Sequence, residues 1–156
     1  AAVRDVDIVI TITSSQTPIL SGAWLRPGMH LNLAGAMKPS CREVDTATLE
    51  RADVLAVDDW QQAHAEAGEF IKAVEEGRLE WSRVQEVGKI VATADGQPRP
   101  PKAITLFKSH GVGVWDVATA ALALDLAKKK GVGIELPIDQ PARKLGRGND
   151  VHRYKS

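Results

Sequence analysis

The sequence is poor in cysteine, in aromatic residues and in net charge. It holds one cysteine among 156 residues, which excludes an internal disulfide framework and a cysteine-based metal cluster. Its 20 basic and 20 acidic side chains cancel, so the composition lacks the basic excess of a typical nucleic-acid-binding protein. No apolar run approaches the roughly 20 residues of a membrane helix, and the N-terminus does not resemble a signal peptide. These absences predict a cytoplasmic protein with no nucleic-acid or membrane partner.

Common motifs for phosphate and metal binding are also absent. No G-x-G-x-x-G pattern follows a strand-like segment, and there is no phosphate loop ending in GK[ST]. The four histidines, at positions 30, 64, 110 and 152, form no H-E-x-x-H pair. We therefore predict no metal site.

The residues that are present are typical of a globular α/β domain. Hydrophobic residues make up 44% and charged residues 26% of the chain, which argues against wholesale disorder. Apolar, β-branched runs predict strands at 6–13, 30–34, 53–59 and 104–107, with a further strand at 134–138. Helical spacing and stop signals predict helices at 45–52, 60–77, 80–96 and 116–130. This alternation predicts an α/β fold with a mostly parallel sheet.

Three of the predicted strands end in small or polar residues. The stretches are TITSS (11–15), NLAGA (32–36) and FKSHG (107–111). Carboxyl ends of parallel strands meet at one edge of a sheet, where open α/β folds bind ligands, and small residues let a flat ligand approach the backbone. Ordinary loops use the same residue types. The turns alone therefore leave open whether this edge binds anything.

The start of the sequence has no initiator methionine and opens almost directly into a strand. A domain normally has some residues before its first strand. We therefore expect the 156 residues to be a fragment of a longer protein.

Longer stretches of the sequence resemble one known family. Six stretches resemble the ornithine cyclodeaminase/mu-crystallin family in their order and spacing. They are VDIVITITSSQTPIL, GMHLNLAGAMKPSCREVD, RADVLAVDD, EAGEF, EVGKIV and ITLFKSHGVGVWDVATAALALDLAKKKGVG. The resemblance covers nearly all of residues 5–136. Its specific signatures are ITLFKS-x-G before an Asp and an Ala-rich helix, and N-x-x-G followed by P-x-x-R-E-x-D.

This resemblance implies a Rossmann-type domain that binds NAD or NADP, and a second domain that binds substrate and forms a homodimer. It assigns residues 1–113 to part of the Rossmann domain, 114–138 to a crossover helix and strand packing toward the second domain, and 139–156 to a polar tail. The family's dinucleotide-binding glycine motif, and its substrate-binding arginine and lysine, would then precede residue 1. The expected fold is accordingly a Rossmann-type sheet truncated at its N-terminus.

The resemblance also implies a set of site residues. Those matched to cofactor contacts are Thr13, Ser14, Asn32, Leu33, Ala34, Gly35 and Ser109. His110 takes the place of an apolar residue, often valine, that borders the substrate in ornithine cyclodeaminase. We predict His110 as a catalytic residue because imidazole exchanges protons near neutral pH. The alternative is that His110 only fills its turn and bonds to the backbone.

Met37 departs from the pattern of true ornithine cyclodeaminases, in which an aspartate acts at that position. A thioether neither takes nor gives a proton, whereas hydride transfer to an imino acid needs no base there because the cofactor carries the hard step. We therefore predict an NAD(P)-dependent oxidoreductase acting on the C–N bond of a small amino or imino acid, either a ketimine reductase or an alanine-dehydrogenase-like enzyme. The alternatives are ornithine cyclodeaminase, converting ornithine to proline plus ammonia, and a non-catalytic mu-crystallin-like binding protein.

Two charged residues, Lys108 and Glu69, are expected to be solvent-exposed. Lys108 follows a buried strand, and we expect its ammonium group to extend to solvent. Glu69 lies on the helix predicted at 60–77, where we expect a solvated face.

Overall fold

The computed structural model describes residues 2–93 and 99–134. Its contacts divide the chain into two compact units, Ala1–Asp116 and Val117–Ser156, each considered by itself below. The functional residues predicted from the sequence all lie in the first unit.

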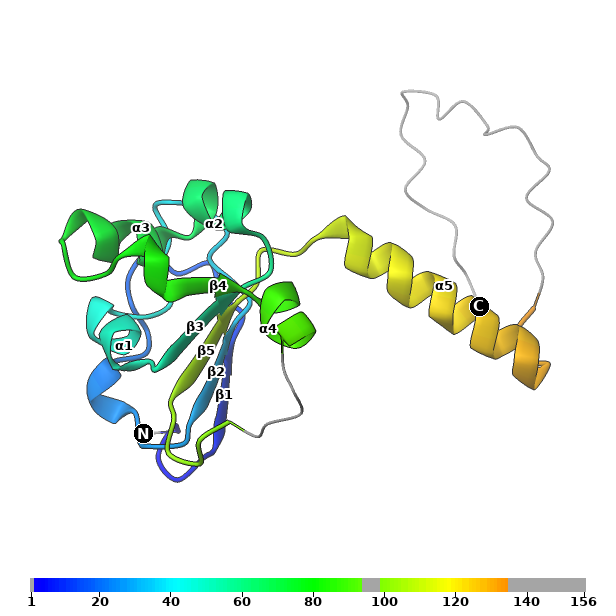
Figure 1. The fold of residues 1–156 in the computed structure, drawn as a ribbon, viewed down its shortest axis with the longest axis horizontal. Coiled ribbons are helices and arrows are strands. Elements are labelled where there is room, and N and C mark those ends of the chain that lie inside the picture. The colour runs from blue at the N-terminus through cyan, green and yellow to red at the C-terminus, as the bar shows by residue number, and fades with distance from the viewer. Residues whose placement is uncertain (1, 94–98, 135–156) are drawn as a thin grey trace, which may run out of the picture. The chain divides into compact units, whose positions relative to one another are not determined.

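A five-stranded parallel sheet forms the centre of the first unit (Figure 1). The strands are β1 (Ile8–Thr11), β2 (His30–Leu33), β3 (Val54–Val57), β4 (Val84–Glu86) and β5 (Thr105–Lys108). Their order across the sheet is β1-β2-β5-β3-β4, and every neighbouring pair is parallel. The prediction of an α/β fold with a mostly parallel sheet is confirmed. Because β5 pairs with both β2 and β3, the last of the described strands lies at the centre of the sheet.

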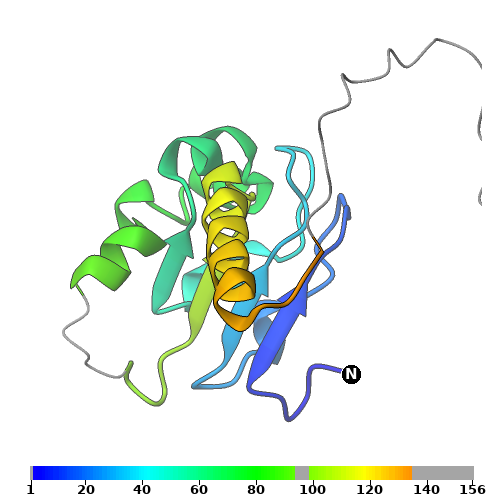
Figure 2. The ribbon, with the colours of Figure 1, turned by 90° about the vertical axis from the view of Figure 1, so that its right-hand side faces the viewer.

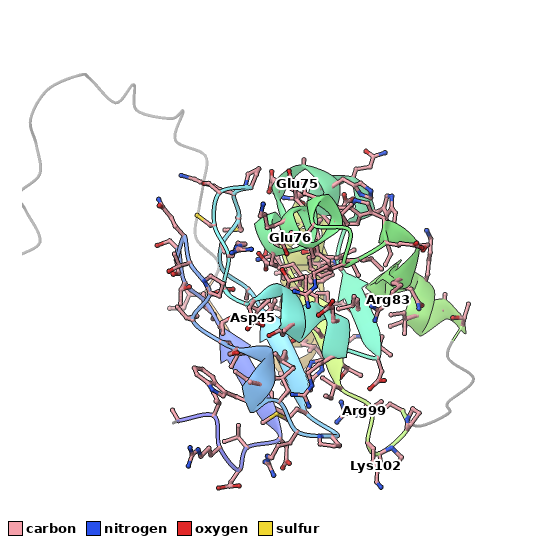
Figure 3. All side chains as sticks on the ribbon, turned by 90° about the vertical axis from the view of Figure 1, so that its left-hand side faces the viewer. Asp45, Glu75, Glu76, Arg83, Arg99 and Lys102 are labelled. Atoms are coloured by element: carbon pink, nitrogen blue, oxygen red, sulfur yellow. The ribbon has the colours of Figure 1, made fainter. Side chains whose placement is uncertain are left out.

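Three helices cover one face of this sheet: α1 (Thr46–Arg51), α2 (Trp60–Glu66) and α3 (Gly68–Glu75) (Figure 1). The β2 side chains Leu31 and Leu33 belong to the buried core, together with Leu106 of β5 and Phe70 of α3. Asp45 caps α1 by accepting a hydrogen bond from the backbone N–H of Thr48, and Figure 3 labels it at the start of that helix. Alternation along the strands therefore buries one apolar face under helices.

The helix predicted at 60–77 is two helices in the structure. Ala67, at φ −76° and ψ 82°, separates α2 from α3. A Cβ on Gly68 would lie 2.3 Å from the carbonyl oxygen of Cys41 and 2.5 Å from that of Pro39. The break thus brings the backbone of α3 against the loop that follows β2, a long-range contact that local helical spacing does not reveal.

The weak helix predicted at 80–96 is also wrong in part. A 3-10 turn at Trp81–Arg83 leads into β4, and the described part of this span, which ends at Thr93, is helical at Val87–Thr93, α4. Val84 pairs with Leu55 at the edge of the sheet. Pairing with β3 therefore overrides the weak helical preference of this segment.

The helix predicted at 116–130 is confirmed and begins earlier: α5 spans Gly113–Lys130, with three lysines in its last turn. No helix among the described residues is long and apolar enough to cross a membrane. The predicted strand at 134–138, from residue 135 on, and the predicted tail at 139–156 lie outside the described residues.

Candidate functional site

A cavity of about 710 Å³ opens where β1 and β2 end. Its lining includes Thr13 and Ser14 after β1, and Ala34, Gly35 and Met37 after β2. This is the edge of the sheet at which open α/β folds bind ligands. The volume lies within the range of about 300–1,000 Å³ that is usual for small-molecule and cofactor sites.

The backbones after β1 and β2 are tied together beside this cavity. The N–H of Ala34 donates to the carbonyl of Thr11 at 2.8 Å, and that of Ala36 donates to the carbonyl of Thr13 at 2.6 Å. A Cβ on Gly35 would lie 2.2 Å from both the nitrogen and the oxygen of Thr13. Only glycine fits at position 35 without moving one of the two strand ends.

Glu43 is a fully buried carboxylate that reinforces this junction. Its Oε1 accepts a hydrogen bond from the N–H of Thr13 at 2.7 Å, and its Oε2 accepts one from the N–H of Gly35 at 3.0 Å. One side chain thus satisfies a backbone donor from each strand end. Sequence reasoning used this glutamate only as a family marker, within P-x-x-R-E-x-D, and missed its structural contacts.

Asp58 holds the turn after β5 in the same manner. Its Oδ2 accepts hydrogen bonds from the backbone N–H groups of His110 at 2.7 Å and Gly111 at 2.9 Å, and from the hydroxyl of Ser109 at 3.0 Å. Asp58 directly follows β3, which ends at Val57. The strand predicted at 53–59 included Asp58, so the strand-end pattern did not point to it.

The imidazole of His110 is buried beside this carboxylate, with Nδ1 3.2 Å from Oδ1 of Asp58. Burial alone would raise the pKa of Asp58, but the hydrogen bonds from His110, Ser109 and Gly111 outweigh it and hold the pKa well below its usual range. The charged carboxylate favours the tautomer with a proton on Nδ1. The other ring nitrogen, Nε2, is buried and has no hydrogen-bond partner among the described residues.

The expectation that Lys108 extends to solvent is wrong. Its side chain is fully buried, and its Nζ donates to the carbonyls of Gly35 and Ala36 and lies 3.3 Å from Oε1 of Glu69. The expectation of a solvated Glu69 is also wrong, because this side chain is fully buried. Burial raises the pKa of Glu69, although the charge of Lys108 opposes this shift. The split between α2 and α3 explains the second error, since Glu69 lies in the inward-facing first turn of α3.

The predicted site residues fall into two groups. Thr13, Ser14, Ala34 and Gly35 line the cavity. The remaining predicted residues are outside its lining: Asn32, Leu33, Ser109 and His110. The side-chain oxygen of Asn32 lies 3.3 Å from Nε2 of His30, and Leu33 is fully buried. No group of three or more His, Cys, Asp or Glu residues within the described ranges could hold a metal ion.

The family model for ornithine cyclodeaminase/mu-crystallin proteins matches residues 1–131. The chain belongs to this family. The resemblance drawn from the sequence is therefore confirmed, and with it the Rossmann-type fold class.

Three similar proteins illustrate the family. Ketimine reductase mu-crystallin of Rattus norvegicus is 36% identical over 125 residues, which are 80% of this chain and 37% of that protein. Delta(1)-pyrroline-2-carboxylate reductase of Thermococcus litoralis, solved with NADH and L-proline, is 33% identical with a TM-score of 0.74, over 86% of this chain and 42% of that one. An archaeal alanine dehydrogenase dimer with bound NAD is 32% identical with a TM-score of 0.67, over 85% and 41% of the two chains. The chain thus spans about two fifths of the length of these relatives.

Proposed function

We propose that the whole protein is an NAD(P)-dependent oxidoreductase acting on the C–N bond of a small amino or imino acid. The observation that carries this proposal is the cavity between Thr13 and Gly35, at the carboxyl edge of a sheet that belongs to this family. The similar proteins named above are two imine reductases and an amino-acid dehydrogenase, and both solved structures contain a nicotinamide cofactor.

The residues around the cavity fit a nicotinamide. The hydroxyl groups of Thr13 and Ser14 supply polar contacts, while Ala34 and Gly35 add no bulky side chains to the lining. When bound, the cofactor supplies the hydride. This chain's own residues would hold the ring, shape its surroundings and exclude water from it.

His110 stays a prediction for the proton-transfer residue of this reaction. Because Asp58 engages Nδ1, a proton can be exchanged only through Nε2. A His110→Leu variant should lower kcat at least tenfold and leave the Kd of NADH unchanged. His64→Leu, on the exposed side of α2, is the matched control and should change neither. An unchanged kcat in His110→Leu would restrict His110 to a role in its turn.

Met37 is the observation against ornithine cyclodeamination. Its side chain lines the cavity and is 53% exposed. At this position, the predicted mechanism of a cyclodeaminase would need a side chain that transfers protons. Ornithine cyclodeaminase therefore remains the second candidate, and a carrier that binds ligand without turnover is the third.

One assay of the whole protein separates the three functions. Oxidation of NADH and NADPH is followed with pyrroline-2-carboxylate or pyruvate plus ammonia, and proline and ammonia are measured with ornithine. Oxidation of cofactor by an imino acid is the expected result. Proline and ammonia from ornithine would replace the proposal with cyclodeamination, and cofactor binding without turnover of any substrate would favour the carrier.

We also propose that the whole protein is a homodimer. The dimeric state of the similar archaeal alanine dehydrogenase supports this. Light scattering at micromolar concentration should give twice the mass of one chain, whereas a single-chain mass would exclude a stable dimer.

A further inference from the structure

Lys108 places a charged group in a part of the molecule that strand alternation would normally fill with an apolar residue. It shares the helix-covered face of β5 with Leu106, two residues before it, and both side chains are buried. A buried ammonium group is costly unless it is paired and hydrogen-bonded. Lys108 meets both conditions, through Glu69 and through two backbone carbonyls.

Those carbonyls belong to Gly35 and Ala36, in the wall of the cavity. Leu33 of β2 is the register partner of Lys108 of β5, so the lysine reaches the segment that immediately follows its neighbouring strand. Ala36 has φ 54°, a left-handed conformation that a residue with a Cβ adopts only when its surroundings enforce it.

Buried charges hold both polar atoms of the Gly35 main chain. Its N–H donates to Glu43, and its carbonyl accepts from Lys108. The N–H of Ala36 donates to Thr13, so the remaining donor of this short segment is also fixed. The two carbonyls consequently point into the protein, toward the buried Lys108.

Stability alone is a weak reason for such an arrangement. A buried ion pair seldom stabilises a protein more than apolar residues of similar volume, because desolvation offsets the attraction between the charges. A methionine and a glutamine could fill much the same space. The feature that they could not reproduce is a strong donor aimed at the Gly35 and Ala36 carbonyls.

We infer that Lys108, neutralised by Glu69, is a positioning residue that sets the backbone of Gly35 and Ala36 for the cofactor. This inference rests on the proposed function for its ligand. It assigns a role to a side chain that does not itself line the cavity and that has no part in the chemistry proposed above.

The test compares three variants of the whole protein by urea unfolding and by NADH titration. Lys108→Met leaves Glu69 unpaired and should lower both the urea midpoint and the affinity. Glu69→Gln keeps the lysine and its carbonyl contacts, so the Kd of NADH should stay within about threefold of the unmodified protein. The double variant K108M/E69Q removes both charges, and its urea midpoint should return toward the original value while the Kd of NADH stays at least tenfold higher.

Recovery of both midpoint and affinity in the double variant would overturn the inference and leave the pair a purely structural one. If the unmodified protein binds neither NADH nor NADPH, the proposed function is wrong, and amide hydrogen exchange then decides the positioning role. In the double variant, exchange at Gly35 and Ala36 should be at least tenfold faster than in the unmodified protein. Unchanged exchange would show that Lys108 does not set this backbone.

Discussion

Gly35 lies where the backbone after β2 meets the backbone after β1. Replacing it with alanine would put a Cβ 2.2 Å from two backbone atoms of Thr13 and 2.7 Å from Oε1 of Glu43. Neither strand end can yield without breaking the hydrogen bonds that join them. We expect Gly35→Ala to lower the free energy of unfolding by about 3 kcal/mol and to abolish NADH binding by the whole protein, as measured by urea unfolding and calorimetric titration.

Gly88 provides the control for this substitution. It lies in α4, and apart from its chain neighbours and the backbone of its own helix, no described atom lies within 4 Å of an added Cβ. Gly88→Ala should leave NADH binding unchanged and stabilise the protein by up to about 1 kcal/mol, because alanine loses less backbone entropy than glycine. Equal effects of the two substitutions would contradict the tight junction at Gly35.

The carboxylate of Asp58 gives a prediction about pH. Because its pKa is lower in the folded protein than in the unfolded chain, its contribution to stability is present above the unfolded pKa, about 3.9 for aspartate, and is lost as the pH falls through the folded pKa. The difference in unfolding free energy between the unmodified protein and Asp58→Asn should therefore be larger at pH 7 than at pH 3.5. Urea titrations at both pH values measure it, and a difference independent of pH would refute the role given to this carboxylate.

At the scale of single elements, β1 is an edge strand of the described sheet, with one neighbour, and it carries exposed apolar side chains. Ile8, Ile10 and Ile12 point to the same side, with exposed fractions of 59%, 62% and 73%. Figure 2 shows β1, in blue, at the edge of the sheet. An apolar edge strand promotes association with other chains.

We expect the 156-residue chain to self-associate through this strand. Ile10→Thr should weaken the association about tenfold, because it removes roughly 1.4 kcal/mol of apolar burial from the contact. The substitution keeps a β-branched residue in the strand. Sedimentation equilibrium gives the association constant. Val91→Thr, which changes a valine with 70% exposure on α4, should leave the association constant unchanged. Equal association of all three proteins would place the contact elsewhere.

Several elements follow from local sequence and others do not. The cap at Asp45, the β-branched run of β1 and the lysines ending α5 are local signals, and each of these elements overlaps its predicted range, with ends that differ by no more than three residues. The break before Gly68 and the strand β4 depend on distant partners, the loop carbonyls near Cys41 and the edge of β3. Spacing within one segment cannot report those contacts.

The same limit applies to the site in the molecule as a whole. The strand-end rule correctly placed Thr13 and Gly35 at one cavity, because parallel strands end at a common edge. The same rule could not predict that Glu43, Lys108 and Glu69 are buried near that edge. Each of them is a charged residue, and it is buried only because another segment of the chain supplies its partner. Buried charges are a property of the assembled fold.

The core of the first unit lies within a limited part of the chain. Every residue of the main hydrophobic cluster falls between Val9 and Leu106, and the partly buried side chains that pack against it also precede Asp116. Among the described residues after Asp116, 117–134, none belongs to this cluster. Because this core lies within the first unit, a chain that ends at Asp116 should fold, with a free energy of unfolding within about 0.5 kcal/mol of that of the 156-residue chain.

A chain that ends at Ala103 is the informative control for this truncation. It lacks β5, the strand that pairs with both β2 and β3, so the sheet would lose its centre and the carbonyls of Gly35 and Ala36 would lose Lys108. Urea unfolding followed by tryptophan fluorescence should then show no cooperative transition. If the chain ending at Asp116 also unfolds without cooperativity, stability depends on residues beyond Asp116, and the core that the sheet and its three covering helices form is insufficient by itself.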